Sequence, residues 1–377
     1  MSINRCFNIS DLQRLARKRL PNPIYHYLEG GADDESTLAR NMNAFADYEL
    51  MPRTLIDTTG LDMSTEVLGQ KIDWPVIIAP TGMSRMFHHD GERAVARAAE
   101  RFGTMYSLST MASVTIEEIG KLTKGPKLYQ IYIHKDRGLT REFIQRCKES
   151  GYDALCLTVD TSVAGNRERD MRTGMTMPPK LTPRSLLSFA AHPRWSLNML
   201  LREKLELVNV AHRVDTGSLS IMEYARSQFD RSLNWDDVAK VIEEWGGPFA
   251  IKGILSPEDA RQAVAVGASA VMIGNHGGRQ LDSVPAPVDC IVPILDAVGD
   301  RLEVILDGGV RRGTDVIKAL ALGARACMIG RAYLYGLAAG GQAGVERALW
   351  ILREELERDM VLLGCPGVRE LNREFLF

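Results

Sequence analysis

Cysteine is scarce in this 377-residue sequence, and its six cysteines lack the spacing of disulfide or metal-binding motifs. None forms a CxxC pair, and Cys156 and Cys327 stand inside apolar runs, where cysteine commonly acts as a small hydrophobic residue. The start of the sequence does not resemble a signal peptide, and no apolar run reaches the length of a membrane span. These absences predict a cytoplasmic protein without structural disulfides or zinc.

An excess of charge of either sign is also missing. The 46 lysines and arginines nearly balance 48 aspartates and glutamates, and the formal net charge of −2 argues against a general nucleic-acid binder. With 45% hydrophobic and 25% charged residues, the composition is typical of a soluble globular protein. No GxGxxG motif follows an expected strand and no P-loop is present, so binding of a dinucleotide or of ATP is poorly supported.

From Trp74 onward, apolar runs of strand length alternate with patterns of helical period. Eight such strands are the number in a (β/α)8 TIM barrel, and a doubly wound sheet is the alternative. We expect one α/β domain: a helical lead-in (1–73), the barrel (74–335) with an insertion after its fourth strand (about 171–233), and C-terminal helices (336–377). The expected strands are Val76–Pro80, Thr104–Thr110, Lys127–Ile133, Ala154–Asp160, Phe249–Ile254, Ala270–Asn275, Glu303–Val310 and Arg325–Arg331. The expected helices between them include Glu92–Phe102, Leu139–Ser150, Pro257–Val266 and Gly313–Leu322.

Two helices are expected before the barrel. The first is a short basic helix from Ser10 to Arg19, which a capping box of Ser10 and Gln13 would start. The second follows it and contains Tyr25 and Tyr27. Because residues two apart cannot share one face of a helix, we expect one of these tyrosines to pack in the core and the other to reach a site.

The expected strands carry their polar side chains at or just past their C-terminal ends. Barrel enzymes build their active sites at that end, so this pattern favours the barrel over the open sheet. Lys252 is the clearest case, because a lysine in an apolar run is costly to bury unless an anionic group meets it. The polar groups are Thr81-Gly82, Ser109-Thr110, Gln130 with Tyr132, Thr158 with Asp160, Lys252, Asn275-His276, Asp307-Gly308-Gly309 and Gly330-Arg331.

The most informative stretch runs from Gly274 to Asp282 and reads Gly-Asn-His-Gly-Gly-Arg-Gln-Leu-Asp. His276 can take a proton near neutral pH, and Arg279 offers a planar fork that holds a carboxylate. The glycines between them let the backbone approach a ligand closely. A base beside a carboxylate clamp is what the oxidation of a 2-hydroxy acid requires, whereas a polar loop with a surface histidine is the plain alternative.

Glycine-rich turns that carry arginine follow the last two expected strands, at Asp307–Gly313 and Gly330-Arg331. In barrels, the loops after strands seven and eight commonly form a phosphate site at a helix N-terminus. These turns therefore favour a mononucleotide cofactor with a single phosphate, and a pair of ordinary turns is the alternative.

Together these motifs resemble those of the FMN-dependent 2-hydroxy-acid dehydrogenase and oxidase family, which includes L-lactate and mandelate dehydrogenases and glycolate oxidase. The resemblance spans nearly the whole chain in the family's order, and the run from Asn275 to Asp282 is highly specific by itself. The matching motifs are Tyr27 before Gly30-Gly31-Ala32, Ala79-Pro80-Thr81-Gly82, Leu108-Ser109-Thr110, Gln130-Ile131-Tyr132, Leu157-Thr158-Val159-Asp160, Ile251-Lys252-Gly253, Asn275 to Asp282, and Asp307 to Gly313.

The resemblance implies FMN as the cofactor and the oxidation of an L-2-hydroxy acid to the 2-oxo acid. His276 would be the base, with Asp160 orienting it and stabilising the imidazolium, while the Cα hydrogen passes to flavin N5 as hydride. Removal of the Cα proton to give a carbanion is the alternative mechanism. The residues implied to bind substrate are Tyr27, Tyr132, Arg167, His276 and Arg279. Those implied to bind FMN are Thr81, Ser109, Gln130, Thr158, Lys252 near flavin N1 and O2, Asp307, Gly308, Arg311, Gly330 and Arg331.

Two departures from the family pattern bear on the substrate. Gly274 stands where the family often has serine, and Met111 stands where short-chain oxidases often have an aromatic residue. Since Gly82 and Ala164 are also small, the pocket could accept a side chain larger than methyl. L-lactate is the expected substrate, and a mandelate-like or other bulky hydroxy acid, or an oxygen-using oxidase, is the alternative.

Two further functions fit a flavin-binding barrel: an isomerase that uses reduced flavin, and a catalytically silent scaffold. The isomerase has no need of a carboxylate clamp, and the scaffold predicts loss of the base or of the clamp. The sequence keeps His276, Arg279, Tyr27 and Tyr132, and it therefore favours the dehydrogenase.

The insertion contains a basic amphipathic stretch at about 181–214, which can lie on an anionic membrane surface. Membrane-associated members of the family have a segment here and pass electrons to quinone. We therefore expect peripheral contact with the inner face of the cell membrane and quinone or another acceptor, with a lid or an oligomer contact as the alternative. By analogy the chain would form a homo-oligomer, a tetramer, and it shows no cytochrome b5-like extension that would carry haem. The basic residues of the stretch are Arg184, Arg194, Arg202, Lys204 and Arg213.

Overall fold

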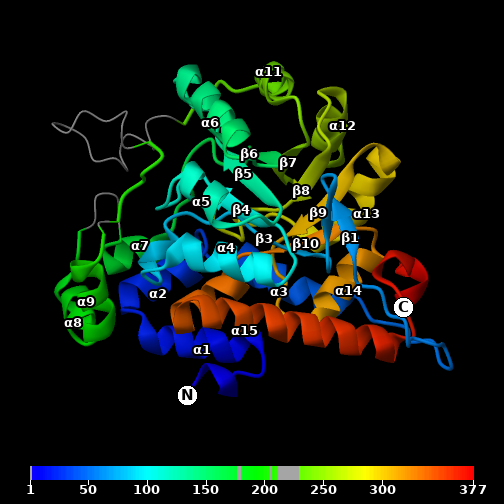
Figure 1. The fold of residues 1–377 in the computed structure, drawn as a ribbon, viewed down its shortest axis with the longest axis horizontal. Helices are drawn as coiled ribbons and strands as arrows, with labels where there is room; N and C mark the ends of the chain where they lie inside the picture. The colour runs from blue at the N-terminus through cyan, green and yellow to red at the C-terminus, as the bar shows by residue number, and fades with distance from the viewer. Residues whose placement is uncertain (1, 176–179, 204, 211–228) are drawn as a thin grey trace.

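Eight parallel strands form a closed barrel surrounded by helices in the computed structural model, which describes residues 2–175, 180–203, 205–210 and 229–377 (Figure 1). The strand order is β3-β10-β9-β8-β7-β6-β5-β4, so the last strand of the chain returns to pair with the first strand of the barrel. The ring closes where the amide of Ile78 in β3 donates a hydrogen bond to the carbonyl of Met105, just before β4, over 3.0 Å. This closure confirms the predicted TIM barrel and excludes the doubly wound sheet.

Each of the eight predicted apolar runs contains one barrel strand. Most strands are shorter than the run that predicted them, because the polar residues at the end of the run leave the sheet and enter the loops. The strands are β3 (Val76–Ile78), β4 (Tyr106–Ser109), β5 (Lys127–Ile131), β6 (Ala154–Thr158), β7 (Phe249–Ile254), β8 (Ala270–Ile273), β9 (Glu303–Asp307) and β10 (Ala326–Ile329).

Small and flexible side chains fill the inside of the barrel. Fully buried alanines on four strands pack there with Met105, Met272 and Met328. A hairpin of β1 (Thr65–Val67) and β2 (Gln70–Ile72) contributes the buried Leu68 to the same cluster, and the Leu68 amide donates to the Glu303 carboxylate at the start of β9 over 2.9 Å. Because the hairpin seals the N-terminal end, the C-terminal end of the barrel is the one left for ligands.

The helices between the strands cover the outside of the barrel (Figure 1). The four predicted helices agree with α4, α6, α12 and α14 to within two residues at either end. The longest helix, α15, is kinked at Gly340 and Gly341 and packs along α1 (Figure 1). The helices after β3 are α4 (Gly91–Arg101), α5 (Ile116–Leu122), α6 (Arg137–Glu149), α11 (Trp235–Trp245), α12 (Pro257–Ala265), α13 (Pro287–Val298), α14 (Gly313–Ala321) and α15 (Arg331–Leu363), with α7, α8 and α9 described below. Short 3-10 turns lie at Ile3–Arg5, Ala44–Asp47, Ser84–Met86, Gly299–Arg301, Val368–Glu370 and Arg373–Phe375.

Three helices precede the barrel: α1 (Ile9–Arg19), α2 (Asn22–Glu29) and α3 (Ser36–Asn43). The predicted capping box at the start of α1 is wrong. The helix begins one residue earlier than expected, and the side chain of Asn8 caps it by accepting a hydrogen bond from the Asp11 amide over 2.8 Å. The two tyrosines of α2 divide as predicted, because Tyr25 is buried and Tyr27 lines the cavity described below.

Three helices follow β6: α7 (Glu168–Thr173), which begins just before the predicted insertion, and α8 (Pro183–Ala190) and α9 (Pro193–Leu201), which lie within it. Helices α8 and α9 lie together at one edge of the molecule, beside α2 and α7 (Figure 1). Lys204 and Arg213 of the predicted basic stretch lie outside the described residues. Among the residues that are described, no helix combines the length and the apolar character needed to cross a bilayer.

Candidate active site

A cavity of about 610 Å³ opens at the C-terminal ends of the barrel strands. Its wall contains every residue that the sequence predicted to bind substrate or FMN, with the exception of Gly308. That glycine lies in the turn after β9 with φ +120°, and the predicted positioning acid Asp160 lies behind His276. The predicted residues in the wall are Tyr27, Thr81, Ser109, Gln130, Tyr132, Thr158, Arg167, Lys252, His276, Arg279, Asp307, Arg311, Gly330 and Arg331.

His276 and Asp160 form a pair from two strand ends on either side of β7, His276 after β8 and Asp160 after β6. Nδ1 of His276 lies 3.1 Å from an Asp160 carboxylate oxygen, which leaves Nε2 as the nitrogen that can take a proton. Burial alone would raise the pKa of Asp160, but the His276 ring and the Lys252 ammonium outweigh burial and hold that pKa below its ordinary value. The pair is therefore an imidazole backed by a carboxylate, an arrangement that suits a proton acceptor.

The backbone turn that presents His276 is left-handed over three successive residues, with φ of +57° at His276, +64° at Gly277 and +73° at Gly278. Such a conformation is uncommon for histidine and is held only where its surroundings impose it. A Cβ at Gly278 would meet the Leu38 backbone nitrogen at 2.7 Å, so only glycine fits the contact between this turn and α3. The motif thus fixes the direction of the imidazole.

Two arginines flank the ring of Tyr27. The guanidinium of Arg279 lies 5.0 Å from the ring centre and that of Arg167 lies 5.4 Å from it. Arg279 donates to the carbonyls of Tyr27 over 2.7 Å and Gly30 over 3.0 Å, whereas Arg167 forms an ion pair with Asp170 over 3.2 Å. Burial, and then the charge of Arg167, lower the pKa of Arg279 below its ordinary value. An anion bound beside Arg279 would relieve both effects.

Lys252 is buried within β7 and forms an ion pair with Asp307 from the end of β9. Burial alone would lower the pKa of Lys252, but the carboxylates of Asp307 and Asp160 raise it above its ordinary value. Lys252 therefore remains a cation in the cavity wall, and Asp307 is the anionic group that the sequence required beside it.

The remaining polar residues of the wall suit a flat ring with a phosphate tail. The Ser109 hydroxyl donates to Gln130 over 3.1 Å, which fixes two hydrogen-bonding side chains beside each other. Arg331 donates to backbone carbonyls, including that of Gly277 over 2.8 Å, and Arg311 donates to the Val310 carbonyl over 2.8 Å. Neither arginine has a carboxylate partner among the described residues, so both are available to an anion. This donor set fits FMN.

Sequence reasoning missed several residues of the wall. Phe87 stacks on Tyr27 with ring centres 6.4 Å apart, and Phe229 meets Tyr132 edge-on with ring centres 5.3 Å apart. Asp170 comes from α7, and Met175 follows the end of that helix. None of these residues follows a strand end directly, so the pattern that revealed the other site residues gives no signal for them.

Comparison with known proteins decides the family. The sequence model of the FMN-dependent dehydrogenases matches residues 16–377. The chain belongs to this family. It is 40% identical over 369 residues to glycolate oxidase of Spinacia oleracea, with 98% of this chain and 95% of that protein covered. It is 41% identical over 371 residues to the putative L-lactate dehydrogenase of Mycobacterium tuberculosis, with 98% and 89% covered.

A solved structure with a closely similar fold is that of the monotopic membrane protein (S)-mandelate dehydrogenase, with a TM-score of 0.94, 35% identity and 99% of each chain covered. The comparisons confirm the predicted family, the TIM barrel and FMN as cofactor. They also confirm the reaction class, because the similar proteins are named as oxidases or dehydrogenases of 2-hydroxy acids. This FMN-dependent dehydrogenase is therefore a 2-hydroxy-acid oxidoreductase.

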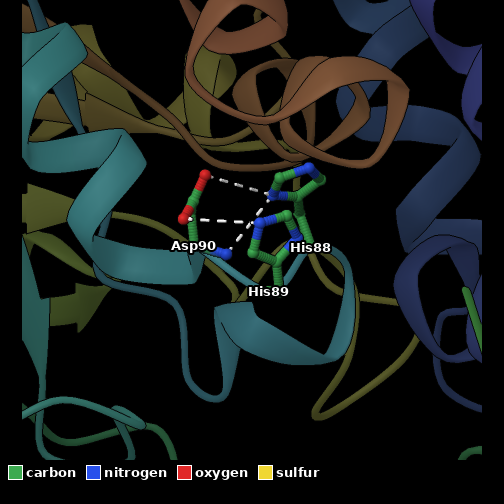
Figure 2. A group of neighbouring side chains, drawn as sticks. All are labelled: His88, His89 and Asp90. Atoms are coloured by element: carbon green, nitrogen blue, oxygen red, sulfur yellow. Dashed lines mark hydrogen bonds and ion pairs between the residues drawn. The ribbon is translucent and has the colours of Figure 1, made fainter. Parts of the chain in front are cut away.

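Outside the cavity wall, the described residues bring three metal-capable side chains together at the start of α4: His88, His89 and Asp90 (Figure 2). The two imidazoles lie 3.8 and 3.6 Å from the Asp90 carboxylate. The Asp90 amide already donates to Nδ1 of His88 over 3.3 Å, and burial, then His89, lower the pKa of His88 to about 4, with Arg194 and Arg19 adding to that effect. This group offers only one carboxylate, and the positive charges of Arg194 and Arg19 lie near it and would repel a cation. We therefore assign no metal to it.

Proposed function

We propose that this FMN-dependent dehydrogenase oxidises an L-2-hydroxy acid with His276 as the base. The observation that carries the proposal is the cavity in which His276, backed by Asp160 at 3.1 Å, lines the same wall as Arg279, a partly buried cation without a carboxylate partner among the described residues. Nε2 of His276 takes the hydroxyl proton of the substrate, and Asp160 stabilises the imidazolium that forms. FMN, when bound, supplies the two-electron acceptor.

The other residues of the wall bind and orient the reactants. Arg279 and Tyr27 hold the substrate carboxylate, Arg167 is the second cation near it, and the Tyr132 hydroxyl binds the substrate oxygen. Lys252 would place its positive charge beside the bound cofactor, where it would stabilise negative charge. The residues that would hold FMN are Thr81, Ser109, Gln130, Thr158, Lys252, Asp307, Gly308, Arg311, Gly330 and Arg331.

The substrate side chain would lie against an apolar wall. Phe87, Met111, Met175 and Phe229 line the cavity, together with the small residues Gly82 and Ala164. Such a wall favours an uncharged side chain, because burial of an unpaired charge is costly. L-lactate remains the expected substrate, and a larger aliphatic or aromatic hydroxy acid is the second candidate, since methionines can repack around side chains of different size.

The test is anaerobic bleaching of the flavin absorbance of the purified protein by a panel of 2-hydroxy acids. We expect rapid bleaching by L-lactate or by an L-acid with a longer apolar side chain, and much slower bleaching by the D-enantiomer of the same acid. The order of rates among glycolate, lactate, 2-hydroxybutyrate and mandelate identifies the side chain. A protein that contains FMN which none of these acids reduces would contradict the proposal.

We also propose that α8 and α9 attach the enzyme to the surface of an anionic membrane, where quinone would accept the electrons. These helices expose large leucine side chains, with 79% of Leu200 and of Leu201 accessible. Arg184, Arg194 and Arg202 are exposed beside the leucines, and no ion pair engages them among the described residues. An apolar ridge with unpaired cations is suited to a peripheral membrane contact. The similar (S)-mandelate dehydrogenase is itself described as monotopic.

Sedimentation with vesicles of anionic phospholipid tests the membrane proposal. Substitution of Leu187, Leu200 and Leu201 with glutamate is expected to release most of the bound enzyme, while flavin reduction by the substrate is unchanged. A matched control replaces Leu55 and Leu362 with glutamate. These leucines are also exposed but lie outside α8 and α9, so this variant should still bind the vesicles. Equal loss of binding in both variants, or no binding by the parent protein, would rule the contact out.

A further inference from the structure

Asp170 places a carboxylate in the wall of a cavity that is built to receive an anion. Asp170 belongs to α7, is only 6% exposed and lines the same cavity as Arg279. A buried carboxylate is costly without a basic partner, and here that partner is Arg167, 3.2 Å away. Burial raises the pKa of Asp170, and the charges of Arg167 and then Arg279 partly offset the rise. Asp170 therefore interacts electrostatically with both arginines that flank Tyr27.

The charges of the cavity wall divide into pairs and a small excess of cations. Asp307 pairs with Lys252 and Asp170 pairs with Arg167 in the wall, and Asp160, directly behind the wall, pairs with His276. The cations that donate only to backbone carbonyls, among the described residues, are Arg279, Arg311 and Arg331.

The position of these three arginines separates two kinds of anion. Arg311 and Arg331 follow β9 and β10, where the proposed function puts the phosphate of FMN. Arg279 lies against Tyr27, where the proposed function puts the substrate. Beside Tyr27 the two arginines and Asp170 together carry one net positive charge, which matches one carboxylate.

We propose that Asp170 determines specificity for monocarboxylates: by neutralising Arg167 it leaves a single unpaired cation at the substrate position, so that a 2-hydroxy acid with a second carboxylate is disfavoured. This inference rests on the proposed function, because it assumes that the substrate carboxylate binds at Arg279. A second carboxylate on the substrate would find the Arg167 guanidinium already paired with Asp170. It would be repelled by the negative charge of Asp170, because like charges in a poorly solvated site repel strongly.

The test uses two acids that bind but lack a hydroxyl group to oxidise, butyrate and succinate, which have the same chain length. Their dissociation constants are measured on the FMN-containing enzyme from the change in flavin absorbance. In Asp170→Asn, which keeps the shape of the side chain, we expect succinate to bind on the order of tenfold more tightly and butyrate to change much less. The matched control is Glu168→Gln on the same helix, because Glu168 pairs with Arg172 outside the cavity. This control should change neither constant.

Removal of Arg167 provides a second, independent comparison. Arg167→Gln leaves Asp170 unpaired, and we expect it to weaken the binding of both butyrate and succinate. Arg167→Gln combined with Asp170→Asn restores the net charge beside Tyr27 and should recover the binding of butyrate. Two results would overturn the inference. One is a double variant that binds butyrate no better than Arg167→Gln does. The other is an Asp170→Asn variant in which the dissociation constants of both acids change by the same factor. Because these measurements need no turnover, they are independent of the bleaching experiment: an enzyme that shows this binding pattern while no hydroxy acid reduces its flavin would refute the proposed function alone.

Discussion

Replacement of His276 with glutamine is expected to slow the reduction of bound FMN by a 2-hydroxy acid by about 10²–10⁴-fold, the range typical of a lost general base. Glutamine keeps a polar side chain of similar reach, but it cannot take the hydroxyl proton. Asp160, which lies 3.1 Å from Nδ1 of His276, would then face a neutral amide and could no longer stabilise a developing positive charge. Anaerobic stopped-flow absorbance at saturating substrate measures the rate of this step directly.

The control for this variant is substrate binding. Since the substrate carboxylate is proposed to bind at Arg279 and Tyr27, the affinity for butyrate should change little while the rate of reduction falls. The FMN content should match that of the parent protein, because His276 is not among the residues proposed to hold FMN. Reduction at the parent rate in a variant that keeps its FMN would show that another group takes the proton.

The barrel could be predicted from sequence because its signal is local. A strand covered on both faces must be a continuous apolar run, and each of the eight runs contains one strand. Parallel strands in a barrel end at the same rim, so polar residues at the run ends had to meet in one place. The cap of α1 was missed because Asn8 and Ser10 both suit a helix start, and only the backbone conformation, extended at Asn8, decides between them.

The parts of the site that escaped prediction depend on contacts between segments distant in sequence. Phe229 reaches Tyr132 because its backbone forms an antiparallel bridge with His134, almost a hundred positions earlier in the chain. Asp170 could be read as part of a charged run, but its pairing with Arg167 inside the cavity follows from the course of α7. Such contacts carry no periodic signal, so these parts of the cavity wall were less predictable than the polar residues at the strand ends.

Replacement of Lys252 with methionine is expected to lower the free energy of unfolding substantially. It leaves the Asp307 carboxylate, only 8% exposed, without its ionic partner, and breaking one side of a buried ion pair typically costs about 3–5 kcal/mol. Urea unfolding of the FMN-free protein, followed by circular dichroism, would measure this loss. We expect the FMN content of the purified variant to fall as well, since a buried negative charge would replace a neutral pair beside the proposed position of the flavin.

A second variant separates charge from packing at the same place. Lys252→Met combined with Asp307→Asn removes both charges, and we expect it to recover most of the lost stability, because a neutral buried pair carries no unpaired charge. FMN binding should recover less, since Lys252 is proposed to place its charge beside the flavin. If the double variant is no more stable than Lys252→Met, the lost stability comes from the shape of the lysine side chain and not from the ion pair. If FMN binds as tightly as in the parent protein, the charge of Lys252 contributes nothing to holding the cofactor.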